Sequence, residues 1–202
     1  MSSPPGRFEF RIWGNNLSAF QDRLAATARP SEPRERAETY ILSRATDAAN
    51  VKIRDGLLVI KVMTEQVGRL ERWRPLLKAG FPLNSRVIAE QVFPSLRMPT
   101  PQITQPSYTQ GEFIRDLIGP NRGLSLVDVV KIRRQFTLED YTAEFAKVGI
   151  AGGLRTETVA IESEDSATLL RAIAKLGLNS QPNTSYVRHL KLMNGIAPRV
   201  SI

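Results

Sequence analysis

The segment Arg7-Phe8-Glu9-Phe10-Arg11 alternates charged and aromatic residues near the start of the chain. Side chains two positions apart on a β-strand project from the same face of the sheet. A strand over this segment therefore carries its charges on one face and its phenylalanines on the other. The inward face of a β-sandwich is apolar, so charges that share one face favour a closed or strongly curved sheet with a charged interior.

The same alternation returns in four later segments, namely Lys52-Ile53-Arg54, Arg69-Leu70-Glu71, Lys131-Ile132-Arg133 and Ala160-Ile161-Glu162. A single Lys-x-Arg strand is most often a solvated face. Several such strands, each alternating with β-branched residues or leucine, indicate a shared cationic site. Buried like charges repel, so this site needs acids or a bound anion to compensate them. We expect Lys52 and Arg54 to face a ligand and to contribute little to the core.

The length and charge of the chain limit its class. The 202 residues fit one domain, and we predict a single domain over residues 1–202. Lys and Arg number 28 against 20 Asp and Glu, which gives a net charge of +8. This excess favours an anionic partner. We expect a phosphate-containing small molecule, with nucleic acid as the alternative; the oligomeric state stays open.

Several kinds of chemistry are excluded by residues that the sequence lacks. It has no cysteine and a single histidine, His189, which excludes thiolate chemistry and metal sites with two histidines. No glycine-rich phosphate loop and no G-x-S-x-G nucleophile elbow occurs. The start lacks the pattern of a secretory signal, and the longest apolar run, residues 57–60, is far shorter than a membrane span. We therefore expect a cytoplasmic protein that does not enter a membrane.

Periodicity and turn signals predict a β-rich α+β fold, an eight-stranded antiparallel tunnel-like barrel with flanking helices. Strands are expected over residues 8–13, 37–43, 50–54, 57–63, 68–73, 124–136, 140–148 and 154–162, and helices over 19–28, 85–92, 111–118, 166–176 and 186–193. Four prolines between residues 94 and 106 preclude regular structure there. We interpret residues 74–122 as the connection between two halves of one barrel, with an interdomain linker as the alternative.

The order of the charged residues along the chain resembles the CYTH superfamily, also called triphosphate tunnel metalloenzymes. The residues that carry the resemblance are Glu9-x-Arg11, Tyr40, Lys52-Ile-Arg54, Lys61, Arg69-x-Glu71, Lys131-Ile-Arg133, Glu144, Ala160-Ile-Glu162 and Asn183-x-Ser-Tyr186. The resemblance covers almost the whole chain, and the ordered set is more specific than any one motif. It implies an antiparallel barrel around a tunnel, in which basic residues hold a triphosphate and glutamates hold Mg²⁺ or Mn²⁺. Family activities include inorganic and thiamine triphosphatase, class IV adenylyl cyclase and RNA 5′-triphosphatase.

Carried over residue by residue, the resemblance implies two sets of ligands and assigns no catalytic residue. The phosphate-binding set is Arg11, Lys52, Arg54, Lys61, Arg69, Lys131 and Arg133. The metal-binding set is Glu9, Glu71 and Glu162, with Glu144 as a further candidate.

The chain departs from the family pattern on the acidic side of the site. Arg7, Trp73, Ala146 and Ala160 stand where the family places acids. Fewer carboxylates are then left to hold a metal ion. Two functions follow. One is metal-dependent hydrolysis of a triphosphate-bearing substrate, such as inorganic triphosphate, a nucleotide or thiamine triphosphate. The other is non-catalytic binding of polyphosphate, a nucleotide or an RNA 5′ end by a protein whose metal site is degenerate.

Overall fold

The computed structural model describes residues 5–196, and its main feature is a closed barrel. The strand order around the barrel is β1-β10-β9-β8-β2-β3-β4-β5. The resolved pairs run antiparallel, including β1 with β10 and β5, β9 with β10 and β8, and β3 with β2 and β4. The predicted fold class, an eight-stranded antiparallel barrel with helices, is confirmed.

The eight predicted strands correspond to the eight barrel strands, and three of the predicted helices correspond to the longer helices. The barrel strands are β1 (Arg7–Gly14), β2 (Arg34–Ser43), β3 (Ala49–Arg54), β4 (Leu57–Val67), β5 (Leu70–Gly80), β8 (Leu124–Thr137), β9 (Thr142–Ile150) and β10 (Leu154–Ser163). The longer helices are α1 (Ser18–Ala25), α5 (Ser166–Lys175) and α6 (Tyr186–Met193). The hairpin between β3 and β4 turns at Asp55 and Gly56, which both have the positive φ typical of two-residue hairpin turns.

The main difference lies between β5 and β8. β5 runs to Gly80 rather than ending near residue 73. A two-stranded sheet follows, formed by β6 (Leu83–Asn84) and β7 (Ser107–Tyr108). The helical turns around it are α2 (Ser85–Val87), η1 (Ile88–Val92), α3 (Phe93–Ser95), α4 (Gln110–Glu112) and η2 (Phe113–Ile118), of which η1 and η2 are π-helical. This segment therefore has structure of its own, because its apolar side chains fill a core.

The chain divides into two compact units that exchange segments along the sequence. The first unit comprises the described residues up to Ala37 together with Met63–Arg74 and Val129–Ser185. The second comprises Glu38–Val62, Pro75–Asp128 and the described residues from Tyr186 onwards. The prediction of a single domain is not tested by this division. The part of the chain that the structure describes contains no helix long and apolar enough to cross a membrane.

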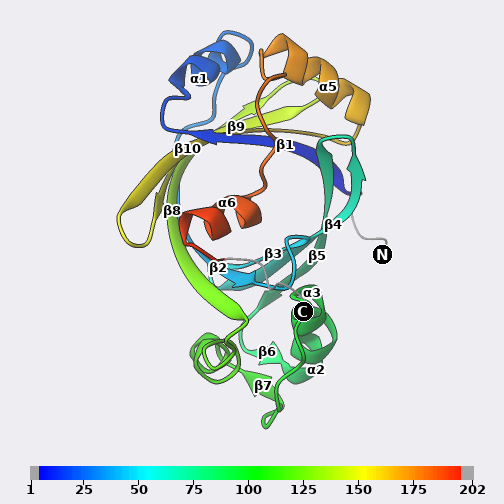
Figure 1. Cartoon of the computed structure of the whole chain (residues 1–202), viewed down its shortest axis with the longest axis vertical. Helices are drawn as coiled ribbons and strands as arrows, with labels where there is room; N and C mark the ends of the chain where they lie inside the picture. Colours follow the sequence, from blue (N-terminus) through cyan, green and yellow to red (C-terminus); the bar gives the residue numbers. More distant parts are fainter. Residues whose placement is uncertain (1–4, 197–202) are drawn as a thin grey trace. The chain divides into compact units, whose positions relative to one another are not determined.

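The core of the first unit lies on one face of its strands, under α1 and α5. Phe8 and Phe10 of β1 are buried there with Leu24 of α1 and with Leu169 and Ile173 of α5. The apolar residues of α5 recur at helical spacing, so one stripe of the helix is buried against β1 and β10 (Figure 1). The alternation of β1 then turns Glu9 and Arg11 to the opposite face.

The second unit has its own core, on the outer faces of β3 and β4. Val51 and Ile53 of β3 are buried with Leu58 of β4 and with Phe93 and Phe113 from the helical turns. Because side chains alternate along β3, Lys52 and Arg54 lie on the face opposite this core. The C-terminal helix α6 also lies against β3 (Figure 1).

Candidate phosphate-binding site

The first unit has a charged face opposite its apolar core, which we call the first charged face. The register aligns three carboxylates there, because Glu9 of β1 is the direct partner of both Glu71 of β5 and Glu162 of β10. Directly opposite side chains on neighbouring strands have Cβ atoms about 5 Å apart, and like charges at that spacing repel. These three acids are the predicted metal-binding set, and the sheet does bring them into one row.

Arg11 compensates two of the acids on this face from a buried position. Its side chain is 5% exposed, and its Nε donates to Glu9 Oε1 at 2.9 Å. Its Nη1 donates to Thr158 Oγ1 at 3.2 Å and lies 3.6 Å from Glu144 Oε1. A charge this buried persists only when it is paired and hydrogen-bonded. Arg11 is therefore held in an ion-pair network within the protein.

Glu144 is the centre of that network. Arg133 Nη1 donates to Glu144 Oε2 at 3.0 Å, and Lys131 is buried on the same face. Burial alone would raise the pKa of Glu144, but the positive charges of Lys131, Arg11 and Arg133 together lower it to about 2. The carboxylate is therefore ionised at any physiological pH.

The other two acids of the row are also engaged. Glu71 is buried, and its Oε2 accepts a hydrogen bond from Trp73 Nε1 at 3.2 Å. Arg7 Nη1 lies 4.0 Å from Glu162 Oε2, and Arg7 Nη2 donates to the backbone oxygen of Glu162 at 2.9 Å. Two residues that stand in place of family acids, Arg7 and Trp73, thus each contact a remaining acid.

These contacts decide how well the first charged face fits a metal ion. Mg²⁺ needs several oxygen ligands in near-octahedral geometry. In the first charged face, each predicted carboxylate instead contacts a guanidinium or an indole N–H. Across residues 5–196, no three His, Cys, Asp or Glu side chains are grouped so that they could hold a metal. The residues as arranged do not fit a resident Mg²⁺ or Mn²⁺.

A second charged face lies on β2, β3 and β4 of the second unit, and its centre is Glu38. The side chain of Glu38 is fully buried, with Lys52 Nζ 3.0 Å from Oε2 and Arg54 Nη1 3.4 Å from Oε1. Lys52 is 12% exposed and Arg54 25% exposed. The expectation that these two cations contribute little to the core is wrong, because they neutralise a buried carboxylate.

Tyr40 joins this cluster to the helix α6. Its hydroxyl donates to Glu38 Oε2 at 2.9 Å, and Lys52 Nζ lies 5.2 Å from its ring centroid. The ring of Tyr40 stacks on that of Tyr186, the first residue of α6, with centroids 5.6 Å apart and an interplanar angle of 12°. The first turn of α6 therefore packs on the charged side of β2, beside the cations.

Lys61 extends the second charged face onto β4. It is half-buried and is the direct strand partner of Asn50. Among the residues that the structure describes, Lys61 makes no ion pair, and Asn50 Oδ1 is buried without a hydrogen-bond partner. In contrast to Lys52 and Arg54, Lys61 keeps its charge available for a ligand.

Arg69 lies apart from the first charged face. Its Nη1 donates to the backbone oxygen of Asn179 at 2.6 Å, and its guanidinium lies 4.9 Å from the ring centroid of Phe10. Phe10 belongs to the apolar core on the other face of β1. The contacts of Arg69 are thus with the loop after α5, and its role as a phosphate ligand stays a prediction.

Glu38 is the one central residue that the sequence prediction missed. It stands two positions before Tyr40, so the strand alternation already placed both on one face. Its pairing with Arg54 depends on the β2–β3 register. The i, i+2 spacing within one strand carries no signal of that pairing.

The comparison with known proteins supports the fold alone. No protein-family model and no curated protein matches the sequence. Solved structures do match. A putative adenylate cyclase (bh2851) from Bacillus halodurans is 11% identical with a TM-score of 0.52, and the match covers 90% of this chain and 95% of that one. The PH1012 protein from Pyrococcus horikoshii OT3 is 15% identical with a TM-score of 0.50, over 89% and 97%. The chain shares its fold with these solved structures, and this barrel is the fold that the resemblance to the CYTH, or triphosphate tunnel, proteins implies.

Proposed function

We propose that the protein binds oligophosphate anions at the second charged face and does so without a resident metal ion. The observation that carries the proposal is the ratio of charges there. Lys52 and Arg54 share one buried carboxylate, that of Glu38, while Lys61 on the same face makes no ion pair among the residues that the structure describes. Asp55 approaches Arg54 at 3.9 Å but is 60% exposed, so solvent screens it. The remaining positive charge favours an anionic ligand.

The first charged face lacks such an excess. Its four acids are balanced by four bases, which are Arg7, Arg11, Lys131 and Arg133 against Glu9, Glu71, Glu144 and Glu162. On the second face Lys52 and Arg54 also pair with a buried carboxylate, but Lys61 adds a positive charge that no acid among the described residues neutralises. We therefore assign the ligand to the second face.

The chemistry of the second face suits a chain of phosphates. Arg54 presents a planar fork for phosphate oxygens, while Lys52 and Lys61 act as compact point charges on flexible stems. These three positions match the ones that hold triphosphate in the family that the sequence resembles. The likeness in fold to a putative adenylate cyclase agrees with a ligand that carries a triphosphate.

The second candidate is metal-dependent hydrolysis of a triphosphate-bearing substrate. The observation in its favour is the row of Glu71, Glu9 and Glu162 on three neighbouring strands. This function requires Arg11 and Arg7 to release the acids that they contact.

Calorimetric titration of the full chain with tripolyphosphate, in EDTA and then in Mn²⁺, tests both candidates. Binding in EDTA that Lys61→Ala weakens, with no release of inorganic phosphate in Mn²⁺, is expected. Absence of binding in EDTA overturns the proposal, and phosphate release in Mn²⁺ alone supports the hydrolase. Parallel titrations with ATP and with RNA bearing a 5′-triphosphate or a 5′-hydroxyl then identify which phosphate carrier binds best.

A further inference from the structure

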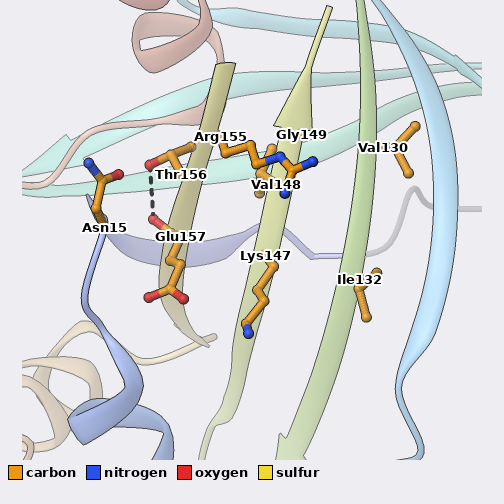
Figure 2. A pocket seen from close by; sticks show the side chains of 9 residues that line it. All are labelled: Asn15, Val130, Ile132, Lys147, Val148, Gly149, Arg155, Thr156 and Glu157. Carbon is orange, nitrogen blue, oxygen red and sulfur yellow. Dashed lines mark hydrogen bonds between the residues drawn. The ribbon is translucent and has the colours of Figure 1, made fainter. Parts of the chain in front are cut away.

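The first unit has a pocket of about 530 Å³ on the outer face of its sheet, opposite the first charged face. Figure 2 shows its lining, in which Val130 and Ile132 come from β8, the other residues from β9 and β10, and Asn15 from the segment just after β1. The pocket lies on the same face as the apolar core of the first unit, because β8 places Phe136 of that core in alternation with Ile132. It is the part of that face which α1 and α5 leave uncovered.

The strand register gives the pocket two rows of three residues. Val130, Gly149 and Arg155 are direct partners across β8, β9 and β10 in one row. Ile132, Lys147 and Glu157 form the next. Gly149 is thus the centre of a row whose two ends carry side chains, and its missing side chain leaves the hollow.

The apolar side chains of this pocket are exposed to an unusual degree. Val130 and Ile132 are each 46% exposed, and Leu154, which precedes the pocket residue Arg155, is 38% exposed. Large apolar residues scattered singly on a surface need no explanation, but neighbouring ones that line a hollow mark binding sites. Their burial by a partner would be favourable by roughly 25 cal/mol for each Å² removed from water.

The pocket also carries charged side chains, and those available to a ligand are positive. Lys147 and Arg155 are exposed and make no ion pair among the residues that the structure describes. Glu157 is engaged differently, because its Oε2 accepts the backbone N–H of Leu17 at 2.7 Å. The pocket therefore presents two available cations around an apolar hollow, and its acid already contributes to the fold.

We propose that this pocket is a docking site for an acidic segment of a partner protein that carries a large apolar side chain. The apolar side chain would occupy the hollow over Gly149, between Val130 and Ile132, and carboxylates would pair with Lys147 and Arg155. A second copy of this chain is a poor occupant, because each copy has a net charge of +8.

The spacing of the strands sets the expected pattern in the partner. Val130 and Arg155 lie two strands apart, which is roughly 10 Å. An extended chain covers that distance in about three residues. The partner segment should therefore place an acid about three residues from its apolar anchor.

The test is a random peptide display library selected on the immobilised full chain, with affinities of the selected peptides measured by fluorescence anisotropy. Selected peptides should pair a large apolar residue with acids at the stated spacing. Lys147→Glu with Arg155→Glu should weaken their binding at least about tenfold, and added salt should weaken it in the parent. The matched control is Arg171→Glu with Lys175→Glu, an equal charge change on α5, which should leave affinity unchanged.

The variant Gly149→Leu tests whether peptide binding can be lost while the protein stays folded. A Cβ at Gly149 would have the backbone oxygen of Val130 as its nearest contact at 3.7 Å, and its φ lies outside the left-handed region. A larger residue in place of this strand glycine should keep or raise the melting temperature while it fills the hollow and abolishes peptide binding. The proposal is overturned if selection yields no peptides, if they lack acids, if they bind Gly149→Leu as well as the parent, or if sedimentation shows the parent to self-associate through this face.

Discussion

On the first charged face Glu144 is shared by Arg11, Lys131 and Arg133, whereas on the second Glu38 is shared by Lys52 and Arg54. Both clusters arise from the same alternation of charge along strands. They differ in net charge. The first face has one carboxylate for each basic side chain, whereas the second face has the additional cation Lys61 without a matching carboxylate. The cations also differ in burial, from 5% exposed at Arg11 to 25% at Arg54. A row of basic residues thus indicates a ligand only where the structure supplies too few acids to neutralise it.

The largest expected effect that tests this comparison is on the stability of the first unit. Glu144→Gln removes the carboxylate but keeps the shape of the side chain, and it leaves Arg11, Lys131 and Arg133 close together and largely buried. Breaking a buried ion pair by removing one partner costs about 3–5 kcal/mol. Urea denaturation of the variant should show a loss of that size in the free energy of unfolding. A loss below about 1 kcal/mol, the level of a surface pair, would contradict a structural role for this network.

The next effect is on the pH dependence of folding, and its sign follows from the direction of the pKa change. The folded protein lowers the pKa of Glu144 from 4.5 to about 2, so the unfolded chain binds the proton more readily. This contribution to stability, roughly 3 kcal/mol, is complete above about pH 5 and is lost as the pH falls from about 4.5 to about 2. Denaturation across that interval should show the parent losing more stability than Glu144→Gln. Parallel curves for the two proteins would refute the assignment.

Much of the fold was predictable because local alternation determines it. Arg7 to Arg11 already separates charges from phenylalanines, and β1 buries Phe8 and Phe10 as that pattern predicts. The helical turns between β5 and β8 were less predictable at their ends. Phe93 and Phe113 are fully buried in a core with β3 and β4, and contacts with distant strands, rather than local propensity, organise the proline-rich segment.

The candidate site was predictable in its residue types but not in its pairing. The sequence indicated that Lys52 and Arg54 share a face, and it did not indicate that both pair with the buried Glu38 of the neighbouring strand. Arg69 shows the same limit, because it shares the alternation of Glu71 in the sequence yet lies just before β5 and contacts Asn179. Side-chain partners that lie across strands or in a loop depend on register and on tertiary contacts, which a single segment does not encode.

A smaller effect is expected when Glu38 is neutralised. Glu38→Gln leaves Lys52 and Arg54, which are partly solvated, so the loss of stability should be about 1–2 kcal/mol and below that of Glu144→Gln. The same change removes the carboxylate that competes with phosphate for both cations. Tripolyphosphate affinity should therefore rise about tenfold in calorimetry. Glu144→Gln, assayed at a temperature where it is folded, is the control, and an equal gain there would place the ligand on the first charged face instead.

The smallest effect is predicted for Lys61, and it separates binding from stability most cleanly. Lys61 is half-buried and makes no ion pair with the residues that the structure describes, so its removal leaves no carboxylate uncompensated. The free energy of unfolding of Lys61→Ala should lie within about 0.5 kcal/mol of the parent. Tripolyphosphate affinity should still fall about fivefold to tenfold, because one point charge of the proposed site is lost. Lys175→Ala, the same change at an exposed position of α5, should alter neither the free energy of unfolding nor the tripolyphosphate affinity. If Lys61→Ala binds tripolyphosphate as the parent does, the surplus charge of the second face has no part in ligand binding. The two faces would then differ only in how completely acidic side chains of the protein neutralise their basic ones.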